Sequence, residues 1–226
     1  MGGCTSRSRD GSERFQSDYN LVLNQIKLNT IPWKKFVSEV AFYGVFARLN
    51  QTKIQAVMKS VGLEKEYNDE NSTLRKFLVI THTNQKCTAK DLISIGLLMC
   101  KGVETEKGEY LCNFLDSMSE KEPLRDITEK MKNLMSIATK SMIELMLQVL
   151  SNPDTKLLSK LAMMDDGVIS EAVKQWIPKG REELGKILYD RKKLIEWVEK
   201  GELTPTKAVL IAIRTYDSLN IPQETH

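Results

Sequence analysis

Residues 127–149, ITEKMKNLMSIATKSMIELMLQV, carry the longest helical pattern in the chain. Apolar residues recur there at intervals of three or four, at Ile127, Met131, Leu134, Ala138, Met142, Leu145 and Val149. Side chains with this spacing lie along one face of an α-helix. Asn152 and Pro153 follow, and proline cannot continue a helix, so the helix is predicted to end before them.

Helical patterns also cover most of the remaining chain, in shorter segments. Thr88 followed by Asp91 resembles a capping box with a shorter acid, which predicts the start of a helix. Thr204 before Pro205 predicts the start of the last helix, because threonine caps helices and proline suits their first turn. A further short helix is expected at residues 182–189. No segment shows convincing period-two alternation, so the predicted fold class is all-α, with helix pairs joined by loops.

The composition is that of an ordinary globular protein. The chain has 226 residues, of which 41% are hydrophobic and 28% are charged, which suits one large domain or two small lobes. The net charge of +3 is small and both signs are interspersed, so nucleic acid is not an expected partner. No apolar run approaches the roughly 18 residues of a membrane span, and no signal-peptide core precedes the first helix. We therefore expect a cytosolic protein that is not secreted and that reaches a membrane only through lipid.

The first six residues, Met1-Gly2-Gly3-Cys4-Thr5-Ser6, match the pattern for N-terminal myristoylation, in which a hydroxyl residue stands at position six. One myristoyl chain binds membranes only marginally, with an association constant on the order of 10⁴ M⁻¹. Cys4 offers a site for a second acyl chain, a palmitoyl group. We expect lipidation at Gly2 and Cys4, a flexible tail over residues 1–18, and attachment to the cytoplasmic face of a membrane. A Met-Gly start that arose by chance or from cloning is the alternative.

Sequence motifs for catalysis and metal binding are missing from the chain. It has no glycine-rich phosphate loop, no G-x-S-x-G and no H-E-x-x-H. Its four cysteines have no C-x-x-C spacing and it has only two histidines, which argues against a zinc site and against a disulfide framework. We therefore expect a protein that is not an enzyme, with no catalytic residues, no metal ligands, no cofactor other than covalent lipid, and no small-molecule substrate.

Three segments carry a resemblance to a known family. Residues 87–116, CTAKDLISIGLLMCKGVETEKGEYLCNFLD, are followed much later by residues 194–201, LIEWVEKG, and by the helical pattern of residues 204–220. They resemble the neuronal calcium sensors, the recoverin-like (calcineurin B-like) branch of the EF-hand superfamily. In that family the corresponding segments join the second and third hands, end the fourth hand and form the C-terminal helix.

The resemblance implies a particular version of the all-α fold. It implies paired EF-hand-like helix-loop-helix units in two lobes with degenerate loops. The N-terminal pair would occupy residues 19–103 and the C-terminal pair residues 104–226. Residues 140–190 depart most from the family and are expected to hold extra helices.

The calcium ligands of the family are mostly missing from these loops. An EF-hand loop needs oxygen ligands at positions 1, 3 and 5 and a bidentate glutamate at position 12. With Asp91 at position 12, the apolar Ile80 stands at position 1. With Asp116 at position 1 of the third loop, Ile127 stands at position 12. Calcium binding is therefore not expected, and one weak site at the Asp165-Asp166-Gly167 turn is the alternative.

The resemblance also implies a function, that of a lipid-anchored adaptor or regulatory subunit. In this fold a hydrophobic groove receives an amphipathic helix of a partner protein, here independently of calcium. Without a calcium switch the groove would stay open or be filled by the protein's own C-terminal helix. The alternatives are a weak calcium sensor and a helical scaffold of a cytoskeletal or ciliary membrane assembly, and the methionines could simply fill the core. The expected groove residues are Trp33, Phe36, Phe42, Phe46, Phe77, Leu92, Leu98, Phe114, Met131, Met135 and Met142.

Overall fold

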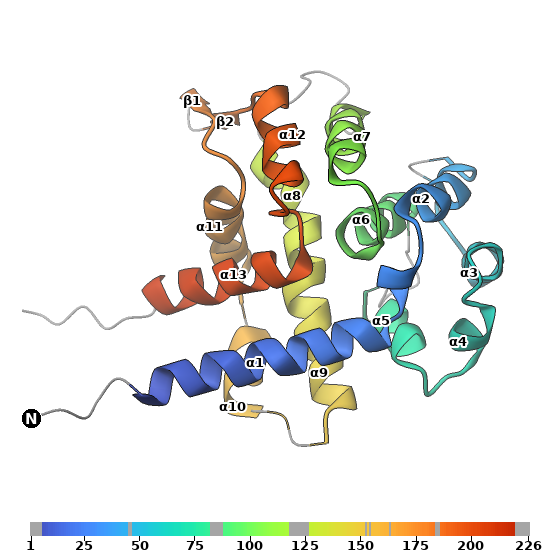
Figure 1. The fold of residues 1–226 in the computed structure, drawn as a ribbon, viewed down its shortest axis with the longest axis horizontal. Coiled ribbons are helices and arrows are strands. Elements are labelled where there is room, and N and C mark those ends of the chain that lie inside the picture. The colour runs from blue at the N-terminus through green and yellow to red at the C-terminus, as the bar shows by residue number, and fades with distance from the viewer. Residues whose placement is uncertain are drawn as a thin grey trace, which may run out of the picture.

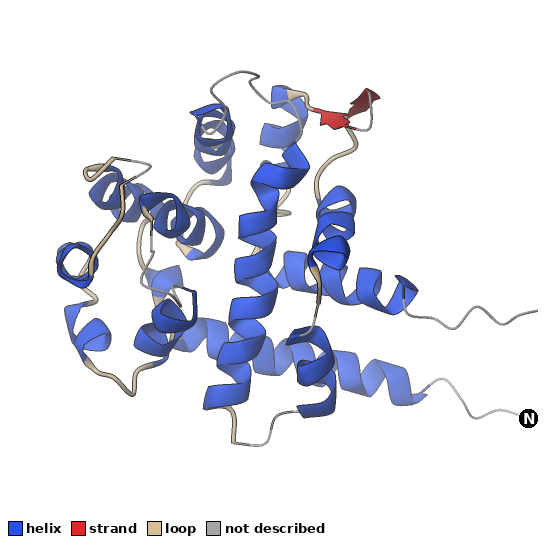
Figure 2. Cartoon of the chain, turned by 180° about the vertical axis from the view of Figure 1, so that it is seen from behind, coloured by secondary structure: helices blue, strands red, loops and turns tan. Residues whose placement is uncertain are grey.

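The computed structural model describes residues 6–44, 47–81, 88–117, 127–151, 153, 155–162, 164–183 and 186–219. Within these ranges the chain is almost entirely helical, which confirms the all-α prediction (Figures 1 and 2). The one exception is a two-stranded hairpin. Its strands, β1 and β2, pair antiparallel with Arg181 opposite Leu188 and Glu183 opposite Lys186.

The helices before residue 104 form the first half of the chain. They are α1 Ser6–Gln25, the 3₁₀ turn η1 Leu28–Thr30, α2 Trp33–Ala41, α3 Gln51–Ser60, α4 Glu64–Asn68, α5 Thr73–Thr81 and α6 Ala89–Met99.

The second half contains longer and more varied elements. They are α7 Glu104–Ser117, α8 Ile127–Ser136, the π-helical segment η2 Ile137–Ser141, α9 Met142–Val149, α10 Thr155–Ala162, α11 Asp166–Trp176, β1 Arg181–Glu183, β2 Lys186–Leu188, α12 Arg191–Glu199 and α13 Pro205–Leu219.

The central column of the molecule is the helical run from α8 through η2 to α9 (Figure 1). It spans 127–149 without a break and ends at Val149, which confirms the predicted helix and its end. Six of its seven periodic apolar residues are fully buried, so the column's apolar face lies in the core. The helix is not uniform, because a π turn at Ile137–Ser141 interrupts the α-helical hydrogen bonding.

Two of the predicted helix starts have the expected capping bonds. The Thr88 hydroxyl accepts the backbone N–H of Asp91, and an Asp91 carboxylate oxygen accepts the backbone N–H of Thr88, so α6 begins with a complete capping box. At α13 the Thr204 hydroxyl accepts the backbone N–H of Lys207, and Pro205 is the first helical residue. These bonds satisfy amide groups that would otherwise lack partners at a helix N-terminus.

The flexible tail expected at residues 1–18 is wrong for residues 6–18, which belong to α1. The physical reason is an apolar stripe at Phe15, Tyr19, Val22 and Ile26, all buried in the core. Its intervals of four, three and four match a helix, and docking this stripe stabilises a segment that is otherwise polar.

The helix expected at residues 182–189 is also wrong, because β1 and β2 lie there. Each strand has three residues. A strand of three residues is too short to show period-two alternation, so the pattern could not reveal it.

A short backbone bridge joins the two helix-loop-helix segments of the first half. Arg48, just before α3, and Thr88, just before α6, form an isolated antiparallel bridge, and the Ala89 N–H donates to the Ala47 carbonyl at 2.9 Å. The outer helices of this unit, α2 and α6, pack against each other. In the second half α7 packs on α12 and α8 packs on α11.

The two halves share one continuous hydrophobic core. Trp33 of α2 reaches across to Tyr110 of α7, with ring centroids 5.3 Å apart in a T-shaped arrangement, and Tyr110 stacks on Phe114. Gly102 makes this contact possible, because a Cβ there would lie 1.8 Å from Trp33 Cδ1. A further link between the halves is the Lys34–Glu106 ion pair, at 2.6 Å.

Candidate functional site

The expected acylation sites, Gly2 and Cys4, lie outside the described residues. Ser6, the hydroxyl residue of the myristoylation pattern, is the first residue of α1. A lipid on Gly2 would therefore be attached directly upstream of a folded helix, whereas the sequence predicted an intervening tail. Any force on such a lipid would act first on α1.

The residues that hold α1 in place lie on one side of the helix. Phe15, Tyr19, Val22 and Ile26 are at most 6% exposed, and α1 packs on α9, α5 and α13. Figure 1 shows α1 crossing α9, with its last turn beside α5. Leu21, on the opposite side of α1, is 51% exposed. The helix thus lies on the surface of the other helices, seated by a narrow apolar stripe.

One buried polar bond fixes the position of α1. The Tyr19 hydroxyl donates to the Ala138 carbonyl at 2.8 Å, and both residues are fully buried. Ala138 lies in the π segment η2, so the bond joins α1 to the one stretch of the central column that is not α-helical. Burial raises the pKa of Tyr19 well above its usual value, so the phenol stays protonated and acts as a donor.

Sequence reasoning missed this contact of α1 with the body of the protein. The four stripe residues have helical spacing, but they are embedded in a segment rich in Ser, Arg and Asp. Such a composition favours a flexible tail when no partner surface is known. The available signal was the aromatic pair Phe15 and Tyr19 at an interval of four.

Most of the expected groove residues lie in the closed core of the structure. Nine of them are at most 4% exposed, namely Trp33, Phe36, Phe77, Leu92, Leu98, Phe114, Met131, Met135 and Met142. Phe42 differs, because it is 84% exposed at the end of α2, and Phe46 lies outside the described residues. A partner helix could reach the nine buried side chains only if an overlying helix moved. The arrangement agrees with the alternative in which these methionines fill the core.

Asp91, at position 12 of the expected second loop, has both carboxylate oxygens occupied by protein donors. One oxygen accepts from the Thr88 amide at 3.0 Å and from the Thr88 hydroxyl at 2.7 Å. The other accepts from the Asn133 side chain of α8 at 3.3 Å, and the same Asn133 amide donates to Ser94. The carboxylate therefore caps α6 and joins it to α8.

Asp116, the expected first ligand of the third loop, lies at the C-terminal end of α7. One of its carboxylate oxygens faces the Arg191 guanidinium of α12 at 3.6 Å. Arg191 also donates to the Asn113 side chain at 2.8 Å. Ile127, which stands at position 12 of this loop, is fully buried as the first residue of α8. An arginine beside the carboxylate opposes the binding of a cation there.

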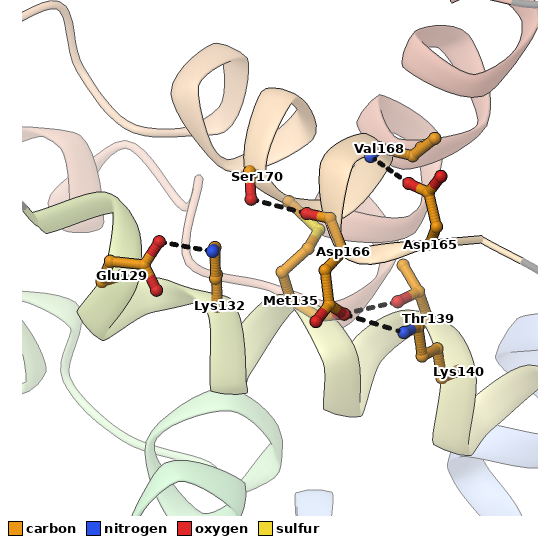
Figure 3. A network of polar contacts seen from close by, with 9 residues as sticks. All are labelled: Glu129, Lys132, Met135, Thr139, Lys140, Asp165, Asp166, Val168 and Ser170. Carbon is orange, nitrogen blue, oxygen red and sulfur yellow. Dashed lines mark hydrogen bonds and ion pairs between the residues drawn. The ribbon is translucent and has the colours of Figure 1, made fainter. Parts of the chain in front are cut away.

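The Asp165-Asp166-Gly167 turn forms the start of α11 (Figure 3). Asp165 is the N-cap, with a carboxylate oxygen that accepts the Val168 amide at 2.8 Å. Asp166 points toward η2 and pairs with Lys140 at 3.3 Å, while its carbonyl accepts the Ser170 hydroxyl. The two carboxylates thus face different partners and do not converge on one point.

No group of three or more His, Cys, Asp or Glu side chains in the described part of the chain could hold a metal ion. At Asp91, Asp116 and Asp165 at least one carboxylate oxygen faces a donor or cation of the protein itself. Oxygen atoms that must release such partners bind Ca²⁺ at an energetic cost.

Two cysteine thiols, Cys100 at the end of α6 and Cys112 in α7, lie in the core and are poor nucleophiles. Burial raises the pKa of Cys100 to about 12 and that of Cys112 to about 11, so both remain protonated near neutral pH. Burial also raises the pKa of the neighbouring Tyr189 hydroxyl. These side chains pack in or against the core of the protein.

Two findings concern the wider identity of the chain. Across the described ranges, no helix is both long and apolar enough to cross a bilayer. Comparisons of the chain with protein families, with curated proteins and with solved structures found no match.

Proposed function

We propose that the protein is a lipid-anchored, non-enzymatic adaptor built from degenerate EF-hand-like pairs, which binds an amphipathic helix of a partner independently of calcium. The observation that most supports this proposal is the set of hydrogen bonds made by the Asp91 side chain. Its carboxylate stands where an EF-hand loop would place a calcium ligand, and it is bonded to Thr88 and Asn133. A side chain with these bonds stabilises the helix pair without an ion.

The backbone arrangement supports the EF-hand-like part of this proposal. The Arg48–Thr88 bridge joins two interhelical segments, as a calcium-loop pair would be joined. The packing of α2 on α6, of α7 on α12 and of α8 on α11 fits two such pairs that share one core. The lipid anchor is supported by the N-terminal pattern alone, since Gly2 and Cys4 lie outside the described residues.

Membrane attachment can be tested by cell fractionation of the full chain. Wild type is expected in the membrane fraction both with calcium and with excess chelator, because attachment depends on acyl chains and not on an ion. Gly2→Ala should move the protein to the soluble fraction, and Cys4→Ser should weaken attachment in part. Equal membrane binding of Gly2→Ala and wild type would contradict the anchor.

Calcium independence can be tested by isothermal titration of the full chain with Ca²⁺. No saturable heat is expected in the micromolar range. A binding heat that disappears in Asp166→Ala would support the alternative of a weak sensor instead. Proteins that co-purify with wild type but not with Gly2→Ala would then identify candidate partners at the membrane.

A further inference from the structure

We propose that α1 is a displaceable internal ligand and that the partner's amphipathic helix docks in its place. This inference rests on the proposed adaptor function and names the surface that would perform it. The surface comprises the parts of α5, η2, α9 and α13 that α1 covers, here called the α1 platform. The structure shows what kind of ligand the platform takes, because a helix is already seated on it (Figure 1).

The apolar contacts define the spacing that a competing helix needs. The stripe of α1 has buried residues at relative positions 1, 5, 8 and 12, which are Phe15, Tyr19, Val22 and Ile26. A partner helix of at least about three turns with the same pattern would present the same side chains to the platform. A longer or wider apolar stripe would bury more area than α1 does and would bind better.

The polar contacts add specificity to this pattern. The Ala138 carbonyl at the bottom of the platform accepts a hydrogen bond from the Tyr19 hydroxyl at 2.8 Å. At the rim, the Thr206 hydroxyl donates to Asn20 and the Thr73 hydroxyl donates to Gln25, both at 3.1 Å. A buried carbonyl left without a donor is costly, so the competing helix should carry a tyrosine or another donor at its second apolar position.

The connection between α1 and the rest of the chain allows displacement. α1 ends at Gln25, and Lys27 then adopts φ +63°, a left-handed conformation that is strained for a lysine. Lys27 is held there by an ion pair of 2.7 Å with Glu66 of α4. Rotation at this single residue would swing α1 away while the α2–α6 and α7–α12 contacts stay intact. Partner binding would thereby release the helix that directly follows the lipidation pattern.

The test uses the full chain and a fluorescent peptide with the sequence of residues 6–27 as the probe helix. In wild type the tethered α1 occupies the platform and should compete, so the peptide binds weakly. Val22→Asp in the chain places a charge in the platform contact and should free the platform, raising peptide affinity at least about tenfold. Leu21→Asp is the matched control on the exposed side of α1 and should leave the affinity within about twofold of wild type.

Two measurements keep the outcome decisive. Hydrogen exchange should become faster in α1 of Val22→Asp while α6 and α8 remain protected. If hydrogen exchange in Val22→Asp instead becomes faster in all helices, that variant is unfolded and Tyr19→Phe is used in its place. Tyr19→Phe removes only one hydrogen bond and should raise the affinity for the peptide about threefold to tenfold. Equal peptide affinity of wild type and Tyr19→Phe, or an equal gain in Leu21→Asp, would overturn the proposal. No lipid or membrane is present in this assay, so its failure would leave the fractionation result standing.

Discussion

At the residue scale, the carboxylates that suggested calcium loops have other roles. Asp91 caps α6, Asp165 caps α11, and Asp116 faces Arg191. Each of these interactions is local or joins neighbouring helices. The chemistry that could have bound an ion therefore stabilises helix ends.

We expect Asp91→Ala to lower the free energy of unfolding by about 1–2 kcal/mol, because α6 loses its capping box and the bond from Asn133. Urea denaturation measures the change. The control is Asp166→Ala, whose side chain is 91% exposed and whose ion pair with Lys140 should contribute less than about 0.5 kcal/mol. Equal effects of the two substitutions would contradict the structural role of Asp91.

The buried thiols predict a loss of stability at alkaline pH. The pKa of Cys100 is raised from its ordinary value near 9 to about 12 in the folded state. Below about pH 9 both states keep the proton and the full stability is present; above it the unfolded state ionises first and stability falls. When the pH is raised from about 8 to about 10, the free energy of unfolding of Cys100→Ala should fall by about 1 kcal/mol less than that of wild type, as measured by urea denaturation. An equal fall in the free energy of unfolding of wild type and Cys100→Ala would contradict the burial of this thiol.

At the scale of elements, a hydrogen bond to the π segment helps to hold α1 in one register. The Tyr19 hydroxyl donates to the Ala138 carbonyl, which lies 119 residues away in the chain. This buried bond joins the N-terminal helix to the central column at one defined position.

Tyr19→Phe should lower the free energy of unfolding by about 1–2 kcal/mol, because a buried carbonyl loses its donor while the packing of the ring is kept. Tyr43→Phe is the matched control, since Tyr43 is only half-buried beside Lys53, and it should change stability by less than about 0.5 kcal/mol. Thermal unfolding, monitored by circular dichroism, distinguishes the two variants. An unchanged midpoint in Tyr19→Phe would mean that the bond to Ala138 has no stabilising role.

At the scale of the whole molecule, one of the contacts between the two halves is a close approach at Gly102. Trp33 packs in the space that a side chain at position 102 would occupy, and it meets Tyr110 of α7 there. The indole is 4% exposed and is surrounded by core residues, so it has little room to move. The contact is part of the core that the two halves share.

Gly102→Ala should therefore disturb the packing of Trp33 against Tyr110 and cost about 2–4 kcal/mol, because the new methyl group overlaps the Trp33 ring. Near-ultraviolet circular dichroism should show weaker aromatic signals before global unfolding. Val103→Ala, at a neighbouring side chain that is 59% exposed, serves as the control and should stay within about 0.5 kcal/mol. Native-like aromatic signals in Gly102→Ala would contradict the tight contact.

The sequence by itself determined the helical content and several helix boundaries. The seven apolar positions from Ile127 to Val149 and the caps at Thr88 and Thr204 are local signals, and local hydrogen bonds and helical periodicity decide them. The mismatch with the EF-hand ligand pattern could also be seen locally, because the ligand positions of that pattern are defined by their spacing along one loop.

Tertiary structure alone decided which apolar faces meet and which stay available. Phe15 and Tyr19 form a helix only because α5, α9 and α13 offer a surface to them, and the β1–β2 hairpin is too short to leave a pattern. The expected groove residues share an apolar character with core residues, so their spacing could not tell a groove from a core. Long-range contacts such as Tyr19 with Ala138 and Trp33 with Gly102 depend on the relative placement of distant elements, which no local signal encodes.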